Sequence, residues 1–370
     1  MKDDQKRAGT SGGDATVDAK RMRAALELAR QGWGMTAPNP MVGAVVAHGA
    51  DVVGAGYHAA YGALHAEPMA LASAGVRARG ATMYVTLEPC THHGQTPPCV
   101  DAIIASGIAR VVVATRDPNP VAAGGVERLR EAGIAVDVGM EEGDARELNA
   151  SFFHAIDSTR PWISLKLAVS IDGAIADARR SGAWLTGGAA RLEVHHQRAG
   201  HDAIAVGIGT VLVDDPLLTV RDVRAPRVAP TRVVFDRSAR LPLTSRLVTS
   251  VADAPVVVVT ADDSSAKARA LASLGIQLVC AQSTAEALVA LRERGLRSML
   301  VEGGAGLAGS LVESGSVDRL IIFRAPVLLG PEALGAFSKS PSWSLDVAPR
   351  LRMLRQQWFE NDEMTIYAMP

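Results

Sequence analysis

The chain has 370 residues, of which 48% are hydrophobic, and this is enough for two domains that each bury a core without disulfide bonds. Its formal net charge is only -1, so it lacks the basic excess with which proteins bind nucleic-acid backbones. No apolar run approaches the roughly 18 residues that suggest a membrane span. Three cysteines give no disulfide framework and fit a reducing cytoplasm.

The first predicted elements indicate an α/β domain. Residues 1–17, rich in Gly, Asp, Ser and Thr, are expected to form a flexible tail. A helix is predicted from Asp18, its possible N-cap, to Gly32. A hairpin, a helix and then alternating strands and helices follow at residues 42–53, 65–74, 82–87, 100–106, 111–114, 126–132 and 134–138. This alternation predicts a largely parallel sheet covered on both faces.

A second α/β domain is expected after a polar stretch at residues 141–160. We place the boundary near residue 158, which gives domains at 18–158 and 159–370. Strands are predicted at 203–207, 232–235, 256–260, 277–280, 298–301 and 319–323, with helices at 188–198, 284–294 and 306–313. Cys280 ends one of the apolar runs, and its thiol is expected to be buried.

Two segments of the first domain combine side chains that bind zinc: His65-Ala66-Glu67, and the stretch from Pro89-Cys90 to Cys99. Catalytic zinc usually has three ligands from His and Cys and a water molecule as the fourth. We expect His65, Cys90 and Cys99 to be these ligands. Glu67 is not needed as a ligand, so it can move a proton from the water to a leaving amine. Two buried thiols and a surface histidine would be the plain alternative.

This pattern is typical of zinc-dependent nucleobase deaminases, except that eight residues, not two, separate the cysteines. The long insert and three other motifs resemble the deaminase half of the bifunctional riboflavin-biosynthesis deaminase-reductase family. These segments are Thr91–Pro98, Ala37-Pro38-Asn39-Pro40-x-Val42-Gly43, Gly56-x-His58 and Arg116-Asp117-Pro118-Asn119-Pro120. The resemblance implies a cytidine-deaminase-like, three-layer αβα domain that binds one zinc ion and acts on a small phosphoribosylamino-diaminopyrimidinone.

The resemblance also implies substrate contacts for Asn39 and His58, and we expect His92 to contact the pyrimidine or the phosphate. Ordinary loop structure is the alternative for Asn39 and His58. Two features depart from the family pattern. Gln95 stands where many relatives have a basic residue, and the loop at 121–126 looks about one residue shorter than usual.

Four segments of the second domain resemble the reductase half of the same family: Lys166–Gly173, Gly182–Thr186, Gly207–Arg221 and Val301–Gly306. The last is a strand, a glycine turn and the start of a helix, which can hold a cofactor phosphate, although it lacks the full Rossmann fingerprint. The resemblance implies a dihydrofolate-reductase-like α/β fold that uses NADPH. By motif position, the cofactor would contact Ala168, Trp184, Thr210, Asp214, Gly303, Gly304, Ala305 and Gly306. The substrate would contact Arg198, Leu218, Arg221 and Glu302.

Reduction of an open-chain ribosyl group needs a hydride and a proton donor or cation, and Lys166 and Asp214 are the candidates for the second role. Arg198 and Arg221 suit the substrate phosphate because a guanidinium group can bind it through two hydrogen bonds. A surface ion pair, or for Asp214 a turn before Pro216, is the plain alternative. Trp184 could instead be a core residue.

Together these features predict a cytoplasmic enzyme, expected to be a homo-oligomer, that deaminates a small phosphorylated pyrimidine and then reduces its ribosyl group to ribityl with NADPH. We expect it to bind neither nucleic acid nor membrane. One alternative is a nucleic-acid base deaminase fused to an unrelated reductase, which would have a basic groove. Another is a zinc-stabilised binding module without enzymatic activity.

Overall fold

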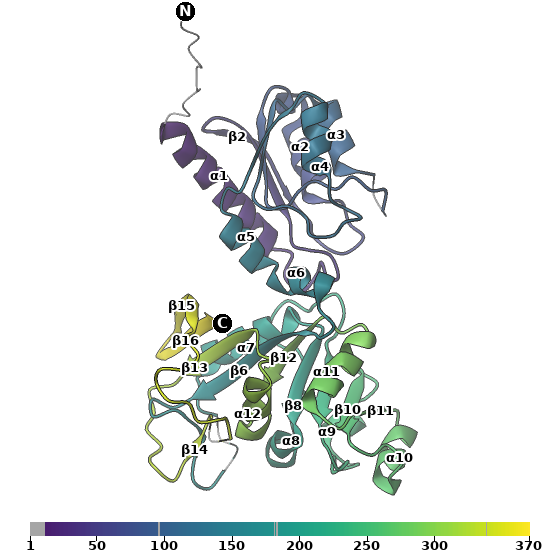
Figure 1. Cartoon of the computed structure of the whole chain (residues 1–370), viewed down its shortest axis with the longest axis vertical. Coiled ribbons are helices and arrows are strands. Elements are labelled where there is room, and N and C mark those ends of the chain that lie inside the picture. Colours follow the sequence, from purple (N-terminus) through teal and green to yellow (C-terminus); the bar gives the residue numbers. More distant parts are fainter. Residues whose placement is uncertain (1–11, 95–96, 181, 183, 338) are drawn as a thin grey trace, which may run out of the picture. The chain divides into compact units, whose positions relative to one another are not determined.

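The computed structural model describes residues 12–94, 97–180, 182, 184–337 and 339–370, and Figure 1 shows its elements. The chain divides into two compact units, Met1–Ile156 and Asp157–Pro370, and this division falls close to the boundary expected near residue 158. Of the expected tail, residues 12–17 belong to helix α1 (Gly12–Arg30) and residues 1–11 lie outside the described residues.

The first unit contains a five-stranded sheet in the order β2-β1-β3-β4-β5. Its strands are β1 (Gly43–His48), β2 (Asp51–Tyr57), β3 (Thr82–Val85), β4 (Arg110–Val113) and β5 (Ala135–Val138). Strands β3, β4 and β5 are parallel, whereas β1 is antiparallel to both β2 and β3. The prediction of a largely parallel sheet is therefore wrong for this unit, because the hairpin adds two antiparallel pairings.

Helices cover both faces of this sheet and make three layers. One face buries apolar side chains of α2 (Ala66–Ala74), α3 (Cys99–Ser106) and α4 (Gly125–Glu131). The other face packs against α1 and α5 (Glu142–Leu148). Neighbouring strand residues alternate between the two clusters, as Val45 and Val46 do. A short 3-10 turn (Gly75–Ala78) and helix α6 (Ala150–Asp157) complete the helical elements of the unit.

Asp18 lies inside α1 and is not its N-cap. Its carboxylate accepts a hydrogen bond from the Tyr84 hydroxyl at 2.6 Å and pairs with Arg110 at 2.8 Å. The sequence signal was a polar residue before an apolar periodic run, and the structure explains that residue by a tertiary contact with the sheet.

Gly54 allows β2 to touch α2, because a Cβ atom there would lie 2.3 Å from the carbonyl oxygen of Ala70.

The second unit contains a nine-stranded sheet in the order β11-β10-β9-β8-β12-β6-β13-β16-β15. The strands are β6 (Trp162–Val169), β8 (Ala203–Gly207), β9 (Thr231–Phe235), β10 (Val256–Thr260), β11 (Gln277–Cys280), β12 (Ser298–Glu302), β13 (Arg319–Arg324), β15 (Arg352–Phe359) and β16 (Asp362–Ala368). All strands from β11 to β13 are parallel, and the β15–β16 hairpin extends the sheet antiparallel. Strand β7 (Ala174–Ala176) pairs separately with β14 (Leu334–Gly335).

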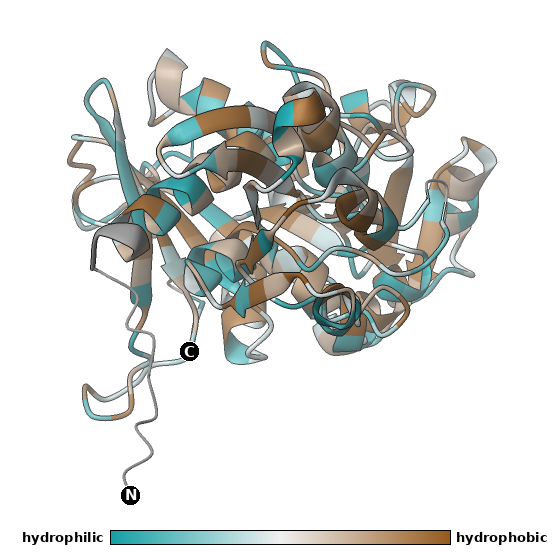
Figure 2. Ribbon diagram, turned by 90° about the horizontal axis from the view of Figure 1, so that it is seen from above, coloured by the Kyte–Doolittle hydropathy of each residue, from teal (hydrophilic) through white to brown (hydrophobic). Residues whose placement is uncertain are grey.

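Helices also pack on both faces of the large sheet. Helices α11 (Thr284–Glu293) and α12 (Ala305–Glu313) bury their apolar side chains on one face. The opposite face carries α7 (Gly188–Ala199), α8 (Ile208–Asp214), α9 (Arg246–Thr249) and α10 (Ala266–Ser273). Figure 2 shows hydrophobic residues concentrated in strands and in parts of the helices. Within the described ranges, no helix combines the length and apolar character needed to cross a membrane.

The prediction that the Cys280 thiol is buried is wrong, because Cys280 is exposed. Strand β11 is at the edge of the sheet, and only Val279 of its four residues is fully buried. Alternate side chains of a strand point to opposite faces, so an apolar run does not show which of its members faces solvent.

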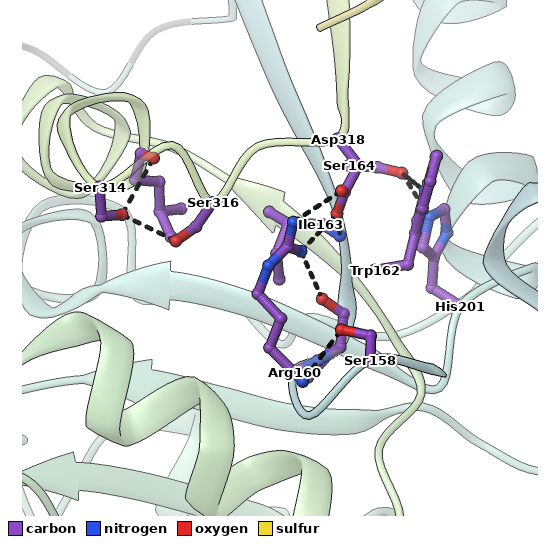
Figure 3. Close-up of polar contacts among 11 residues, drawn as sticks. Ser158, Arg160, Trp162, Ile163, Ser164, His201, Ser314, Ser316 and Asp318 are labelled. Carbon is purple, nitrogen blue, oxygen red and sulfur yellow. Dashed lines mark hydrogen bonds and ion pairs between the residues drawn. The ribbon is translucent and has the colours of Figure 1, made fainter. Parts of the chain in front are cut away.

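Polar contacts fix the start of the second unit (Figure 3). Arg160 donates two hydrogen bonds to Asp318, at 2.6 and 2.8 Å, and the same carboxylate accepts the main-chain N–H of Ile163 at 2.7 Å. Ser164 Oγ lies 2.9 Å from His201 Nε2, while His201 Nδ1 lies 2.8 Å from the carbonyl oxygen of Gln197. These bonds tie β6 to the end of α7.

Candidate active sites

His65, Cys90 and Cys99 come together at the ends of helices in the first unit. His65 is the N-cap of α2, Cys99 begins α3, and Cys90 lies in the loop after β3. His65 Nδ1 is 3.2 Å from the Cys99 sulfur and 3.6 Å from the Cys90 sulfur. Their ligand atoms all lie within 4.8 Å of one another, and no other such group of three occurs within the described ranges.

This geometry fits a tetrahedral zinc ion. Zinc bonds of about 2.0–2.1 Å to nitrogen and about 2.3 Å to sulfur would place tetrahedral ligand atoms roughly 3.5–3.8 Å apart. The His65–Cys90 separation of 3.6 Å lies in this range, and the His65–Cys99 separation of 3.2 Å is slightly shorter. A hydrogen bond from the Cys99 thiol, together with His65, lowers the pKa of Cys90 and so favours the thiolate that binds metal.

Glu67 is in the first turn of α2 and is only 3% exposed. Burial raises the pKa of its carboxyl group to about 7. Glu67 lines a cavity of about 290 Å³ together with His65 and Cys90. A carboxyl group that can both accept and release a proton near neutral pH therefore stands beside the candidate zinc ligands.

Asn39, His58 and His92 line the same cavity. His58 Nδ1 is 3.1 Å from the carbonyl oxygen of Leu64, so this nitrogen must donate. Burial lowers the pKa of His58 and keeps the ring neutral, so Nε2 accepts from the Asn39 amide at 3.4 Å. His92 Nδ1 is buried and has no hydrogen-bond partner among the described residues, which suits a polar ligand.

Sequence reasoning gave no role to several other cavity residues. Asp117 and Asn119 belong to the motif at 116–120 and also line the cavity, as do Tyr61 and Phe152. Burial raises the pKa of Asp117 to about 6. The only signal in the sequence was membership of a family motif, because one acid and one amide in a loop indicate no particular chemistry.

The two departures from the family pattern have different outcomes. Gln95 lies outside the described residues. The loop at 121–126 packs against the cysteine loop, since Thr91 Oγ1 donates to the carbonyl oxygen of Ala123 at 2.9 Å. A Cβ atom on Gly125 would lie 1.9 Å from the carbonyl oxygen of Pro89, so glycine is needed for this close approach. The loop therefore supports the Cys90 position.

In the second unit, candidate cofactor residues gather around α8. Thr210 and Asp214 are one helical turn apart, and a Cβ atom on Gly304 would lie 3.5 Å from Thr210 Oγ1. The turn at 303–306, which leads into α12, is thus adjacent to α8. Asp214 lies beside the main chain at Gly182, because a Cβ atom on Gly182 would lie 2.8 Å from Asp214 Oδ1. Ala168 is on β6, which is separated from β8 by β12.

Trp184 is 77% exposed, so the alternative that it is a core residue is wrong. The Arg191 guanidinium lies 5.5 Å from the centre of its ring. An exposed indole in this position is free of core packing and can stack on a flat ligand.

Arg198 and Glu302 form a nearly buried ion pair. Arg198 Nε is 2.5 Å from Glu302 Oε1, and Arg198 Nη2 is 2.9 Å from Oε2. Arg198 Nη1 also donates to the carbonyl oxygen of Thr219 at 2.9 Å. The bidentate edge of Arg198 is therefore occupied by Glu302. Arg221, whose side chain is exposed and bonds to Thr219 Oγ1 at 2.8 Å, has the better geometry for a substrate phosphate.

The acid–base candidates Lys166 and Asp214 belong to different elements, β6 and α8. Within the described residues no hydrogen bond or ion pair joins them. Burial lowers the pKa of Lys166, and the nearby Glu302 carboxylate acts in the opposite direction. Leu218 is 3% exposed and packs in an apolar cluster with Ile204, so any substrate contact would come from its main chain, where φ is 50°.

Comparisons with known proteins match both units. The family model of the RibD C-terminal domain matches residues 161–362, and that of the cytidine and deoxycytidylate deaminase zinc-binding region matches residues 15–115. The riboflavin biosynthesis protein RibD of Aquifex aeolicus is 46% identical over 85% of this chain and 88% of its own length. The Escherichia coli protein of the same name is 40% identical over 90% of this chain and 95% of its own.

Comparisons with solved structures give the same family. A diaminohydroxyphosphoribosylaminopyrimidine deaminase/5-amino-6-(5-phosphoribosylamino)uracil reductase from Thermotoga maritima superposes with a TM-score of 0.84 at 35% identity, covering 96% of this chain and 99% of that one. Acinetobacter baumannii RibD superposes with a TM-score of 0.83 at 36% identity and the same coverage.

These matches confirm the expected pairing of a cytidine-deaminase-like domain with a RibD reductase domain. They exclude fusion to an unrelated reductase and a zinc module without enzymatic activity. The chain belongs to the RibD family of riboflavin biosynthesis, whose members are bifunctional enzymes with a zinc-dependent deaminase domain and an NADPH-dependent reductase domain.

Proposed function

We propose that the first unit deaminates a phosphoribosylamino-diaminopyrimidinone and that the second reduces the ribosyl group of the product to ribityl. The observation that carries this proposal is the convergence of His65, Cys90 and Cys99, next to a cavity that His65, Cys90 and the buried Glu67 line. The name of the Thermotoga maritima relative, a deaminase and reductase of such compounds, supports the choice of substrate.

His65, Cys90 and Cys99 would hold the zinc ion, which when bound lowers the pKa of a water molecule and makes it a nucleophile near neutral pH. Glu67 would accept a proton from the attacking water and deliver it to the amino group that leaves as ammonia. A carbon–oxygen bond forms as the carbon–nitrogen bond breaks. Asn39, oriented by His58, and His92 place the pyrimidine in the cavity.

In the second unit, NADPH when bound supplies the hydride that reduces the imine or carbonyl form of the open ribosyl chain. The turn at 303–306 and Thr210 hold cofactor phosphate through main-chain N–H groups and a hydroxyl. Trp184 and Asp214 contact the remainder of the cofactor. Lys166 is the proton donor, because its lowered pKa eases proton release. Arg221 binds the substrate phosphate.

We further propose that the enzyme acts on free small molecules and not on nucleic acid, because its net charge is only -1. A reducing compartment such as the cytoplasm fits, since Cys90 and Cys99 must stay reduced to serve as thiolates. Assembly into a homo-oligomer is supported by large exposed apolar side chains such as Leu345 and Trp358. Sedimentation and salt-dependent oligonucleotide binding test these points.

The test of function uses the zinc-loaded full chain with the diaminopyrimidinone and either NADPH or NADH, following ammonia and cofactor absorbance together. We expect ammonia release without any cofactor, and oxidation of NADPH only when the deaminated product is present. A zinc-loaded protein that releases no ammonia would contradict the proposal.

A further inference from the structure

Helix α7 holds the main chain of the segment at residues 217–222. His195 and Arg198 are three residues apart and lie on one side of the helix. His195 Nδ1 is 3.2 Å from the main-chain nitrogen of Arg221, and Arg198 donates to the carbonyl oxygen of Thr219. The segment has positive φ at Leu218 (50°) and at Asp222 (61°), a conformation that residues other than glycine rarely adopt. Two bonds from α7 therefore stabilise a strained stretch of main chain.

This segment carries Arg221, the arginine proposed to bind the substrate phosphate. Arg221 lines a cavity of about 360 Å³ together with Trp184, Arg191 and His195. The bidentate edge of Arg198 is bonded to Glu302, so it is not available to bind the substrate phosphate. The position of the Arg221 guanidinium thus depends on how firmly the main chain of the segment is held.

The contact with His195 restricts the protonation state of the ring. A main-chain N–H can only donate, so His195 Nδ1 must accept and must carry no proton. The neutral ring then has its proton on Nε2. The imidazolium form would place an N–H group against the N–H group of Arg221, so protonation and this hydrogen bond exclude each other.

We propose that His195 is a positioning residue of the reductase: the neutral ring holds the main chain at Arg221 so that the guanidinium can bind the substrate phosphate, and protonation releases it. This inference rests on the proposed role of Arg221. His195 itself contacts Arg221 and not the reacting atoms.

The charged groups around His195 favour the neutral ring. Arg198 comes from its own helix and Arg221 from the segment, and both oppose a further positive charge, while Glu302 of β12 and a main-chain hydrogen bond with Thr219 of the segment act in the opposite direction. Arg191 and Asp222 also line the cavity and have opposite charges. Burial, followed by the two arginines, lowers the pKa of His195 below the ordinary imidazole value. Release of the segment should therefore begin only in mildly acidic solution.

The experiment measures KM and kcat for reduction of the deaminated substrate between pH 5 and pH 8 in the full chain, in the wild type, His195→Asn and His195→Leu. The Asn Oδ1 atom can replace Nδ1 as an acceptor and does not titrate. We expect the wild-type KM to rise as pH falls relative to that of His195→Asn. His195→Leu should show a KM raised by about two- to tenfold at every pH, with a smaller change in kcat.

The substrate phosphate also titrates near pH 6, but it does so equally for every variant, so the ratio of wild-type KM to His195→Asn KM isolates the histidine. His196→Asn, at an exposed position of the same helix, is the matched control and should follow the wild type. Deamination by the same samples should not change among the variants at any one pH.

A ratio that stays constant from pH 8 to pH 5, or a His195→Leu variant with wild-type KM, would overturn the inference. If His195→Leu does not fold, the pH dependence of the ratio of wild-type KM to His195→Asn KM still tests the inference. Absence of reduction in the wild type at pH 8 would instead contradict the proposed function, and an unchanged KM in Arg221→Lys would contradict the role of Arg221.

Discussion

The two candidate sites are built in different ways. In the deaminase unit, the candidate zinc ligands and Glu67 come from two helix N-termini and one loop, and His65, Glu67 and Cys90 line a single cavity. In the reductase unit, the candidate residues are spread over β6, α7, α8, β12 and the segment 217–222. A short motif of rare metal-binding side chains can be understood from its chemistry, whereas a dispersed site made of common residues can be recognised only by resemblance.

The largest expected effect concerns a candidate zinc ligand. Cys99→Ser removes one of the two thiolates, so we expect loss of bound zinc and a fall in deamination of at least about 1,000-fold, while reduction of deaminated substrate continues. Metal analysis and ammonia release measure this. Cys280→Ser, at an exposed thiol of the other unit, is the matched control. Full zinc occupancy and activity in Cys99→Ser would show that Cys99 is not a ligand.

The next effect concerns stability of the reductase unit. Glu302→Gln leaves Arg198, which is 8% exposed, without its counter-charge, so the free energy of unfolding should fall by about 3–5 kcal/mol in urea titrations. Glu127→Gln is the control, because it breaks an ion pair with Arg116 in which both side chains are about half exposed. Equal stabilities for the two variants would show that the Arg198–Glu302 pair does not hold the site together.

We expect His201 to make the free energy of unfolding depend on pH, by a similar or smaller amount. Burial lowers its pKa to about 4, below the unfolded value of about 6.5, so the unfolded chain binds more protons between these values. The contribution of His201 to the free energy of unfolding is complete above pH 6.5. It is lost as pH falls toward 4, by on the order of 3 kcal/mol. His201→Phe should flatten this slope, as followed by tryptophan fluorescence. An identical slope in both proteins would assign the acid sensitivity to other groups.

The smallest expected effect concerns Arg221. Arg221→Lys keeps the charge but loses the planar pair of donors, so the reductase KM should rise by roughly three- to tenfold without change in deamination. Steady-state kinetics with both substrates measure the effect, and Arg227→Lys serves as control. If both variants behaved alike, the phosphate would have to be bound elsewhere.

Much of the fold could be predicted from periodicity. The strands and helices around His65, Cys90 and Cys99 lie where the apolar pattern places them, because each is amphipathic or fully buried. Asp18 was misread because its partners, Tyr84 and Arg110, are distant in the sequence. The β15–β16 hairpin gave little signal, since β15 is an edge strand whose side chains are mostly exposed.

The sites show the same contrast. The cluster of His65, Cys90 and Cys99 was expected as a metal site because few structures other than a metal centre bring a histidine and two cysteines together at helix ends. The pairing of Arg198 with Glu302 could not be predicted, since common charged residues far apart in the sequence have many possible partners. The contact between His195 and Arg221 was also missed, because the partner of the His195 ring is a main-chain nitrogen, and such a group leaves no signal in the sequence.

The central claim is that one chain carries two independent sites, and Glu67→Gln tests it most directly when ammonia release and NADPH oxidation are measured on one zinc-loaded sample. Loss of proton transfer should slow deamination by about 100- to 10,000-fold, while the variant reduces pre-deaminated substrate at the wild-type rate and keeps its zinc. Wild-type deamination by Glu67→Gln, or loss of both activities in the folded, zinc-loaded variant, would contradict the claim.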